Sequence, residues 1–413
     1  MRETTARHVV IIGGGIMGCT TAFYITHGKR PKGTTVTVIE PSTKGVAQGA
    51  SGKAGGLVAK WAYPKDLVED SFEEHERLAE EYGGEERWGW RYVNCGSWEG
   101  KSESANTNPN TAPEGTKKKD LHKTAELDAV LAEIFAQPRE KKGMPEDLDW
   151  VKEELSGHYT PMAELYDTAQ VFPYEFTTSM MNLAMEEGAT LISGRVTTIN
   201  KADGQVTGVT YIDNETKQPT TISATDVVLC AGAWSSSLVP ELPISSTRAH
   251  SIIIYAKEDV ELSPYVLFTE IMLPSGETVT PEIYGRPNGE VYVCGPGDDF
   301  PLPATVDEVE VHKPACQSLW DSVTGISKEL REGTLEFEQA CYLPLLDVAS
   351  GPVVGELSKV AKKLWVATGH SCWGICNAPG TARILRNGIM GDSPPRAASS
   401  LRPSKVLPGM GDD

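Results

Sequence analysis

The sequence predicts an α/β protein in two parts, one built on a mostly parallel sheet and the other on an antiparallel sheet. Three observations favour this fold. An apolar strand, a glycine-rich turn, a helix and a second strand follow one another over residues 8–40. Two later segments, 226–232 and 363–374, again run from an apolar strand into glycine. Residues 245–300 between them are rich in alternating apolar and polar positions, the pattern of half-buried strands.

The first unit occupies the start of the chain. His8–Ile12 is a short run rich in β-branched residues, which is typical of a buried parallel strand. A glycine turn follows, and residues 19–27 read as a helix. Thr34–Glu40 is a second strand that ends in an acid. This order gives a complete βαβ unit, the element from which Rossmann-like folds are built.

Three glycines in the first turn match the spacing of a dinucleotide-binding motif. Gly13 allows the tight turn, Gly15 lets the backbone approach a pyrophosphate, and Gly18 lets helix and strand pack closely. The helix that follows offers free N–H groups to phosphate oxygens. Glu40 is placed to accept hydrogen bonds from ribose hydroxyls, and its charge disfavours a 2′-phosphate. The motif predicts a bound dinucleotide, with a purely structural glycine turn as the alternative.

Composition limits the classes of partner. The chain has 413 residues, enough for two or three domains, and a formal net charge of −19 that opposes binding to nucleic acids or anionic membranes. No apolar stretch reaches the roughly 20 residues of a membrane span, and no signal peptide is visible, so we expect a cytoplasmic protein. Eight cysteines without a CxxC pair or a matching Cys/His set predict reduced thiols and no metal site.

Three segments stand apart from this pattern. Residues 99–120 are polar and rich in Pro, Asn and Gly, and we expect a flexible insertion there. Residues 121–137 are compatible with a helix. Residues 393–413, with several prolines, are expected to form a disordered tail.

The returning segments favour FAD over NAD as the dinucleotide, because a nucleotide domain assembled from separate pieces is typical of large flavoproteins. Four stretches, 8–18 with Glu40, 49–56, 226–235 and 364–380, resemble the D-amino-acid-oxidase-like FAD superfamily. That superfamily includes glycine oxidase, sarcosine oxidase and the amadoriases. Within it, the sequence is most similar to a fungal amadoriase-like group of oxidoreductases.

The resemblance implies a discontinuous Rossmann-like FAD-binding domain of the GR2 type and an antiparallel-sheet α+β substrate domain. The first would comprise residues 1–75, 165–240 and 335–392, and the second residues 76–164 and 241–334. The implied activity is oxidation of a C–N bond in a small molecule, an amine or amino-acid derivative, by hydride transfer to flavin and reoxidation by oxygen. Two alternatives stay open, a flavin dehydrogenase with another electron acceptor and a flavin-bound regulatory or trafficking-type protein. The oligomeric state is also open, a monomer included.

The resemblance also implies a set of residues around the cofactor, spread over all the matching stretches. The residues implied to hold FAD are Gly13, Gly15, Ile16, Met17, Gly18, Glu40, Pro41, Ala50, Ser51, Lys53, Gly55, Gly56, Leu57, Val196, Ala231, Gly232, Trp234, Cys341, Gly369, His370, Trp373, Gly374, Ile375 and Cys376.

The sequence departs from the superfamily where the substrate should be held. Leu343 stands where glycine and D-amino-acid oxidases carry the arginine that grips a substrate carboxylate. Cys376 stands where sarcosine-oxidase-like members carry a lysine. Cys341 lies near the position of their flavin-linking cysteine, so a covalent link and a buried structural thiol are both open. The substrate anchor is therefore the unsettled part of the site.

Four other residues are candidates for catalysis or substrate contact, each with a plain structural alternative. Lys53 and Arg286 are cations that could replace the missing anchor, and either could instead be an ordinary solvated side chain. His370 precedes the last flavin loop and is a candidate acid or base, or a packed histidine. Tyr342 would wall the pocket or belong to the core.

Overall fold

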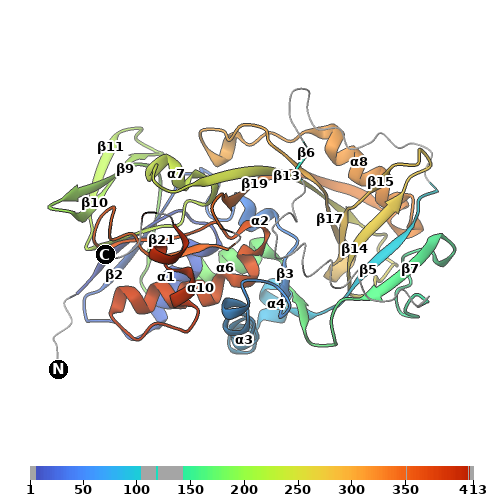
Figure 1. Cartoon of the computed structure of the whole chain (residues 1–413), viewed down its shortest axis with the longest axis horizontal. Coiled ribbons are helices and arrows are strands. Elements are labelled where there is room, and N and C mark those ends of the chain that lie inside the picture. Colours follow the sequence, from blue (N-terminus) through green and yellow to red (C-terminus); the bar gives the residue numbers. More distant parts are fainter. Residues whose placement is uncertain (1–5, 104–117, 120–142, 350, 408, 410–413) are drawn as a thin grey trace.

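The computed structural model describes residues 6–103, 118–119, 143–349, 351–407 and 409. The expected insertion at 99–120 and the expected helix at 121–137 lie mostly outside these residues. Two large sheets occupy opposite ends of the molecule's long axis, and two long strands, β13 (Ile244–Tyr255) and β19 (Thr334–Leu346), run between them (Figure 1).

One sheet has eight strands in the order β11-β10-β9-β2-β1-β12-β21-β20. Its middle strands β9, β2, β1, β12 and β21 are parallel neighbours, and β10, β11 and β20 join antiparallel. β-branched residues suit these strands because both faces are covered. The bounds are β1 His8–Ile12, β2 Thr35–Glu40, β9 Thr190–Ala202, β10 Gln205–Asp213, β11 Pro219–Ser223, β12 Asp226–Leu229, β20 Val353–Glu356 and β21 Leu364–Thr368. The first βαβ unit and the two later strand-to-glycine segments, 226–232 and 363–374, therefore contribute strands to one sheet.

Four helices pack together beside this sheet: α1 (Ile16–His27), α3 (Lys65–Tyr82), α6 (Pro173–Glu186) and α10 (Gly374–Met390). Their apolar faces share one core with strands β1, β2 and β21. Because α1 packs against both α6 and α10, its N-terminus is held rigidly at the end of β1.

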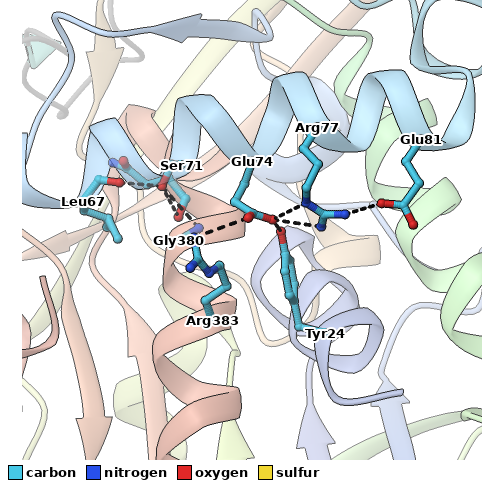
Figure 2. A network of polar contacts seen from close by, with 9 residues as sticks. Tyr24, Leu67, Ser71, Glu74, Arg77, Glu81, Gly380 and Arg383 are labelled. Atoms are coloured by element: carbon cyan, nitrogen blue, oxygen red, sulfur yellow. Dashed lines mark hydrogen bonds and ion pairs between the residues drawn. The ribbon is translucent and has the colours of Figure 1, made fainter. Parts of the chain in front are cut away.

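A polar network links three of these helices at their exposed side (Figure 2). The Glu74 carboxylate on α3 accepts hydrogen bonds from the Tyr24 hydroxyl of α1 at 2.6 Å and from Arg77 at 2.9 Å, and it pairs with Arg383 of α10 at 3.3 Å. Nearby, the Gly380 N–H of α10 donates to the Ser71 hydroxyl at 3.2 Å. These contacts tie α3 to α1 and α10.

The second sheet has ten strands, eight of them in the order β6-β18-β13-β17-β16-β14-β5-β7, with β15 beside β14 and β19 beside β13. The remaining bounds are β5 Asn94–Lys101, β6 Lys118–Lys119, β7 Ser156–Pro161, β14 Tyr265–Met272, β15 Thr278–Val279, β16 Glu282–Gly285, β17 Glu290–Cys294 and β18 Gly297–Asp298. α8 (Lys313–Thr324) and α9 (Lys328–Arg331) share a core with one face of this sheet.

The strand period of two separates the faces of this sheet. On β17, Val291 and Val293 belong to the core that includes α8, whereas Tyr292 packs into the core on the opposite side. The same alternation on β16 buries Ile283 toward α8 and turns Tyr284 the other way. The second face of the sheet is therefore free to form the wall of a site.

Smaller elements connect the two sheets. β3 (Leu57–Ala59), β8 (Thr168–Gln170) and β4 (Arg91–Tyr92) form a three-stranded sheet. Short helices lie around it and beyond: α2 Ala50–Lys53, α4 Gly84–Trp88 and α7 Ser235–Leu238. α2 contacts both α6 and β19, so it bridges the two halves.

Two expectations differ from the structure. β19 pairs with β13 in the ten-stranded sheet, although the expected boundary put residues 335–346 with the FAD-binding part. The expected disordered tail is ordered as far as it is described, with α11 (Ala398–Leu401) and α12 (Pro403–Val406) packed against β20. Leu401 and Leu407 are buried there, so apolar residues between the prolines hold the tail in place. Residues 408 and 410–413 lie outside the described part.

Across the described ranges, none of the helices has both the length and the apolar character needed to cross a bilayer.

Candidate active site

A cavity of about 270 Å³ lies where the carboxyl ends of the parallel strands meet the second sheet. Its wall combines the β1–α1 turn, the end of β2, residues 48–57, residues 230–238 and residues 367–375 with strands of the ten-stranded sheet. Ligands of open α/β sheets bind outside the carboxyl ends of the strands. The cavity therefore lies where the fold class predicts a dinucleotide.

Two of the three motif glycines in the turn at the cavity leave no room for a side chain. Gly13 has a φ of +105°, and a Cβ there would lie 2.5 Å from the Cys230 carbonyl oxygen. A Cβ on Gly18 would lie 1.9 Å from the Gly13 carbonyl oxygen, so helix and turn could not pack. Gly15 differs, because its nearest neighbour would be the Ser51 hydroxyl at 3.1 Å. The fold therefore requires glycine at Gly13 and Gly18, whereas at Gly15 a Cβ would meet only a side-chain hydroxyl.

The first turn of α1 faces the cavity. Its Ile16 N–H donates to the Ser51 hydroxyl of α2 at 2.9 Å, so a residue from another element caps the helix. The positive end of the helix dipole adds to these N–H groups. Turn and helix together offer the cavity an anion-binding end.

Glu40 closes this end at the last residue of β2. Its two oxygens accept the N–H groups of Gly14 at 2.6 Å and Ser42 at 2.9 Å. Burial raises the pKa of the Glu40 carboxyl to about 7, against the opposite pull of the two backbone hydrogen bonds. Because the side chain lines the cavity, hydroxyls of a bound ribose would reach a carboxylate that is already oriented.

A segment from the second half of the molecule covers the cavity near Glu40. We call residues 301–307 the strap. Its Asp307 carboxylate accepts hydrogen bonds from the Ser42 hydroxyl at 2.6 Å and the Thr43 N–H at 3.0 Å. The Trp234 indole donates to the Pro303 carbonyl at 2.8 Å, and the Tyr342 hydroxyl donates to the Pro301 carbonyl at 2.8 Å. The Tyr342 and Trp234 side chains thus both line the cavity and anchor the strap.

Lys53 and Cys341 lie together in the wall. The Lys53 ammonium donates to the Ala340 carbonyl at 2.9 Å, and burial lowers its pKa. Burial raises the pKa of the Cys341 thiol to about 11, although the Lys53 charge opposes this rise. A thiol that stays protonated near neutral pH is a poor nucleophile. This setting favours a packed thiol over one prepared for a covalent link.

His370 is buried in the loop between β21 and α10. Its Nε2 lies 3.0 Å from the Thr381 hydroxyl of α10. Burial lowers the pKa of the imidazole to about 3, so the ring is neutral at physiological pH. A neutral, hydrogen-bonded imidazole positions the loop and supplies no proton as an acid.

Arg286 lies outside the cavity wall and holds its loop from behind. One guanidinium nitrogen donates to the carbonyls of Ala54 at 2.8 Å and Gly55 at 2.7 Å. The other terminal nitrogen pairs with Glu290 at 2.7 Å, and the guanidinium lies over the Tyr292 ring at 4.7 Å. Arg286 is therefore a positioning residue for the loop at 54–55.

Most of the residues predicted for the cofactor or for catalysis meet in this one wall. The members that line it are Gly13, Gly15, Ile16, Met17, Glu40, Pro41, Ala50, Ser51, Lys53, Gly55, Gly56, Leu57, Val196, Ala231, Gly232, Trp234, Cys341, Tyr342, His370, Trp373, Gly374 and Ile375. The members outside it are Gly18, Arg286, Gly369 and Cys376.

The second sheet contributes cavity-lining residues that are not among the predicted site residues. Phe268, Glu282 and Cys294 line the cavity from three neighbouring strands, and the register places them side by side. Tyr284 and Tyr292 form the next row, with ring centroids 5.4 Å apart. An acid two residues before a tyrosine in an apolar strand was the available signal, because such residues share a face.

Glu282 and Tyr284 are joined within this wall. The Tyr284 hydroxyl donates to a Glu282 oxygen at 2.5 Å, and both side chains are buried. Burial, and then the charge of Glu282, raise the pKa of the Tyr284 hydroxyl well above its ordinary value. Tyr284 therefore keeps its proton and holds the carboxylate in place.

Comparison with known proteins gives a consistent result. The family described as "FAD dependent oxidoreductase" (DAO) matches residues 8–387. "Putative oxidoreductase TDA3" of Saccharomyces cerevisiae is 31% identical over 96% of this chain and 94% of the relative. Among solved structures, glycine oxidase from Bacillus cereus ATCC 14579 has a TM-score of 0.69 at 18% identity and covers 95% of this chain and 100% of its own. L-proline dehydrogenase from P. horikoshii has a TM-score of 0.66 at 16% identity, over 96% and 97% respectively.

Proposed function

The chain belongs to the DAO family of FAD-dependent oxidoreductases, and from this premise we propose that it oxidises a C–N bond of an amine or amino-acid derivative inside the cavity described above. The observation that carries the proposal is the make-up of the wall. One end is an anion-binding turn with Glu40, and the other is an aromatic and acidic face of the second sheet. Such a cavity can hold a dinucleotide and present its reactive end to a small molecule.

The residues present fit FAD. The α1 N-terminus and Gly15 suit the pyrophosphate, since a side chain at Gly15 would project toward it. Glu40 suits the ribose hydroxyls. Val196, Gly374 and Ile375 all line the cavity, and we propose Val196 for the adenine side and the start of α10 for the flavin side. We propose these residues as the FAD site, with the covalent link through Cys341 disfavoured.

When bound, FAD supplies a two-electron acceptor that takes a hydride from the carbon next to the substrate nitrogen. The chain's own residues bind, orient and exclude water. Burial lowers the pKa of the neutral His370 imidazole to about 3, which makes it a weak base, and Tyr284 keeps its proton, so neither side chain is prepared to take up a proton. The first turn of α10 presents the positive end of a helix dipole and favours negative charge beside it.

Oxygen is the proposed electron acceptor. The structural neighbours include an oxidase and a protein described as a dehydrogenase, so the acceptor needs a direct experiment. The purified yellow protein is mixed without oxygen with a panel of amines and amino acids, and oxygen is then admitted. We expect bleaching of the flavin by a substrate, followed by recovery of colour with one equivalent of peroxide.

Bleaching without recovery in oxygen would instead support the dehydrogenase. A flavin that only dithionite bleaches would contradict catalysis and support a regulatory protein. Placement in a fungal amadoriase-like group and a cytoplasmic location are also retained as proposals. The yeast relative is described as a putative oxidoreductase, which supports a fungal oxidoreductase group, and the amadoriase-like character stays a prediction.

A further inference from the structure

The sheet wall of the cavity carries an acid, Glu282, in an apolar row. Phe268 on β14 and Cys294 on β17 are its register partners, and all three side chains line the cavity. Glu282 is only 7% exposed. Placing a carboxylate in such a wall is costly unless a charged or hydrogen-bonding partner compensates for the lost water.

Tyr284 fixes the direction of this carboxylate. Its hydroxyl donates to Glu282 at 2.5 Å, while its ring packs under the loop at residues 54–55, where a Cβ on Gly55 would lie 2.6 Å from the ring. The carboxylate is therefore fixed relative to this loop, which also lines the cavity. A freely moving surface acid would have no such constraint.

Lys53 and Glu282, two charged side chains of the cavity wall, have different electrostatic neighbours. The Lys53 ammonium interacts electrostatically with Cys341, Lys44 and Asp307, of which Asp307 belongs to the strap. Glu282 acts at the other side, where burial and then its charge raise the pKa of the Cys294 and Cys372 thiols. In the described part of the wall, Lys53 and Arg195 are the only lysine or arginine side chains. The Glu282 side is therefore electronegative.

We propose that Glu282 binds the positively charged nitrogen of an amine substrate and accepts its proton before the hydride leaves the adjacent carbon, so that the protein takes cationic amines and needs no substrate carboxylate. This inference rests on the proposed function. The aromatic residues Phe268, Tyr292 and Trp373 line the same cavity, and aromatic rings are suited to neighbour a cation. The net charge of −19 attracts cations over a longer range. Leu343, which stands where related oxidases carry an arginine, lines the cavity with an apolar side chain.

The test uses three probes of one shape and different charge: benzylamine, benzyl alcohol and benzoate. Each is titrated into the FAD-loaded wild-type protein, and binding is followed by the flavin difference spectrum and by calorimetry. We expect benzylamine to bind at least about tenfold more tightly than benzyl alcohol, and benzoate to bind most weakly. This comparison needs no variant, so a folding defect cannot obscure it.

Variants then locate the effect. Glu282→Gln should abolish the preference for benzylamine over benzyl alcohol, and Tyr284→Phe should reduce it by a smaller factor. Glu270→Gln removes an exposed carboxylate from neighbouring β14 and should leave the preference unchanged. The flavin spectrum of each variant confirms that the cofactor site is intact.

Tightest binding of benzoate, undetectable binding of benzylamine, or an unchanged preference in Glu282→Gln would overturn the inference. In those cases a yellow protein that a carboxylated substrate bleaches would still uphold the proposed function. A protein that binds benzylamine as expected but is bleached by no amine would contradict the proposed function and leave the cation site standing.

Discussion

Asp307 accepts a hydrogen bond from the Ser42 hydroxyl at 2.6 Å, and this contact ties the strap of the second half to the loop that follows β2. The same carboxylate accepts the Thr43 N–H and hydroxyl at 3.0 and 2.9 Å. Because Ser42 also donates its N–H to Glu40, the strap and the ribose end of the cavity share one hydrogen-bonded unit.

Loosening the strap should speed the loss of FAD. Asp307→Ala removes three hydrogen bonds to a charged group, and such bonds contribute about 1.5–3 kcal/mol each. We expect FAD to dissociate at least about tenfold faster, measured by the recovery of flavin fluorescence on dilution. Asp259→Asn, on an exposed turn, is the control. Equal dissociation rates in the two variants would show that the strap does not retain the cofactor.

Two glycines of the same motif should respond differently to alanine. Gly15→Ala meets only the Ser51 hydroxyl, so the fold should survive while FAD affinity falls by about 100-fold or more, because the new methyl group occupies the pyrophosphate side. Gly18→Ala forces its Cβ onto the Gly13 carbonyl, and the fold itself should be destabilised. FAD titration and urea unfolding distinguish the two effects. Retained FAD binding in Gly15→Ala would place the cofactor elsewhere.

The apoprotein should lose stability as pH rises through the titration of Glu40. The folded-state pKa of about 7 lies above the value of 4.5 for an unperturbed carboxyl, so folding favours the protonated form. The stabilising contribution is full below about pH 4.5 and lost by about pH 7, with a size of about 3 kcal/mol at most. Urea unfolding of the apoprotein at several pH values measures it.

Glu40→Gln is the matched variant for this pH dependence. The glutamine amide cannot accept both backbone N–H groups, so the free energy of unfolding of the variant should be lower overall. It should also change less with pH over the same range. An identical slope in wild type and variant would assign the pH dependence to other groups.

Arg286 should matter for stability more than for chemistry. Replacing it with methionine leaves the half-buried Glu290 without its cation, with the Tyr255 hydroxyl still donating to it, and frees the Ala54 and Gly55 carbonyls. Removing one partner of a buried pair costs about 3–5 kcal/mol. The double variant Arg286→Met/Glu290→Gln should recover part of that loss in urea unfolding. A substrate-specific rise in KM without loss of stability would instead indicate direct contact with ligand.

Local patterns in the sequence were sufficient for the first half of the site. The run His8–Ile12 is β1 with the predicted bounds, and the motif glycines and Glu40 lie where the βαβ unit places them. Such residues are recognisable because neighbours in sequence determine their geometry. The resemblance to a known superfamily added residues 49–57 and 369–375, whose function no local pattern specifies.

Contacts between distant segments could not be predicted. Tyr342 and Trp234 line the cavity as expected, yet nothing in their local sequence indicates that both donate to the strap. A cation in a strand-rich region makes Arg286 a candidate substrate anchor by sequence. Only the fold shows that its guanidinium instead donates to the carbonyl of Ala54. Glu282 was missed because its role depends on which antiparallel strands are neighbours.

The most direct test of the account is the visible absorption spectrum of the purified protein before and after acid precipitation. We predict flavin absorbance in the native protein and its release into the supernatant, because burial raises the pKa of the Cys341 thiol and a protonated thiol is a poor nucleophile for a link to the cofactor. Colour in the pellet would instead identify a covalent flavin. A colourless protein that added FAD cannot reconstitute would contradict the central claim that this cavity holds FAD.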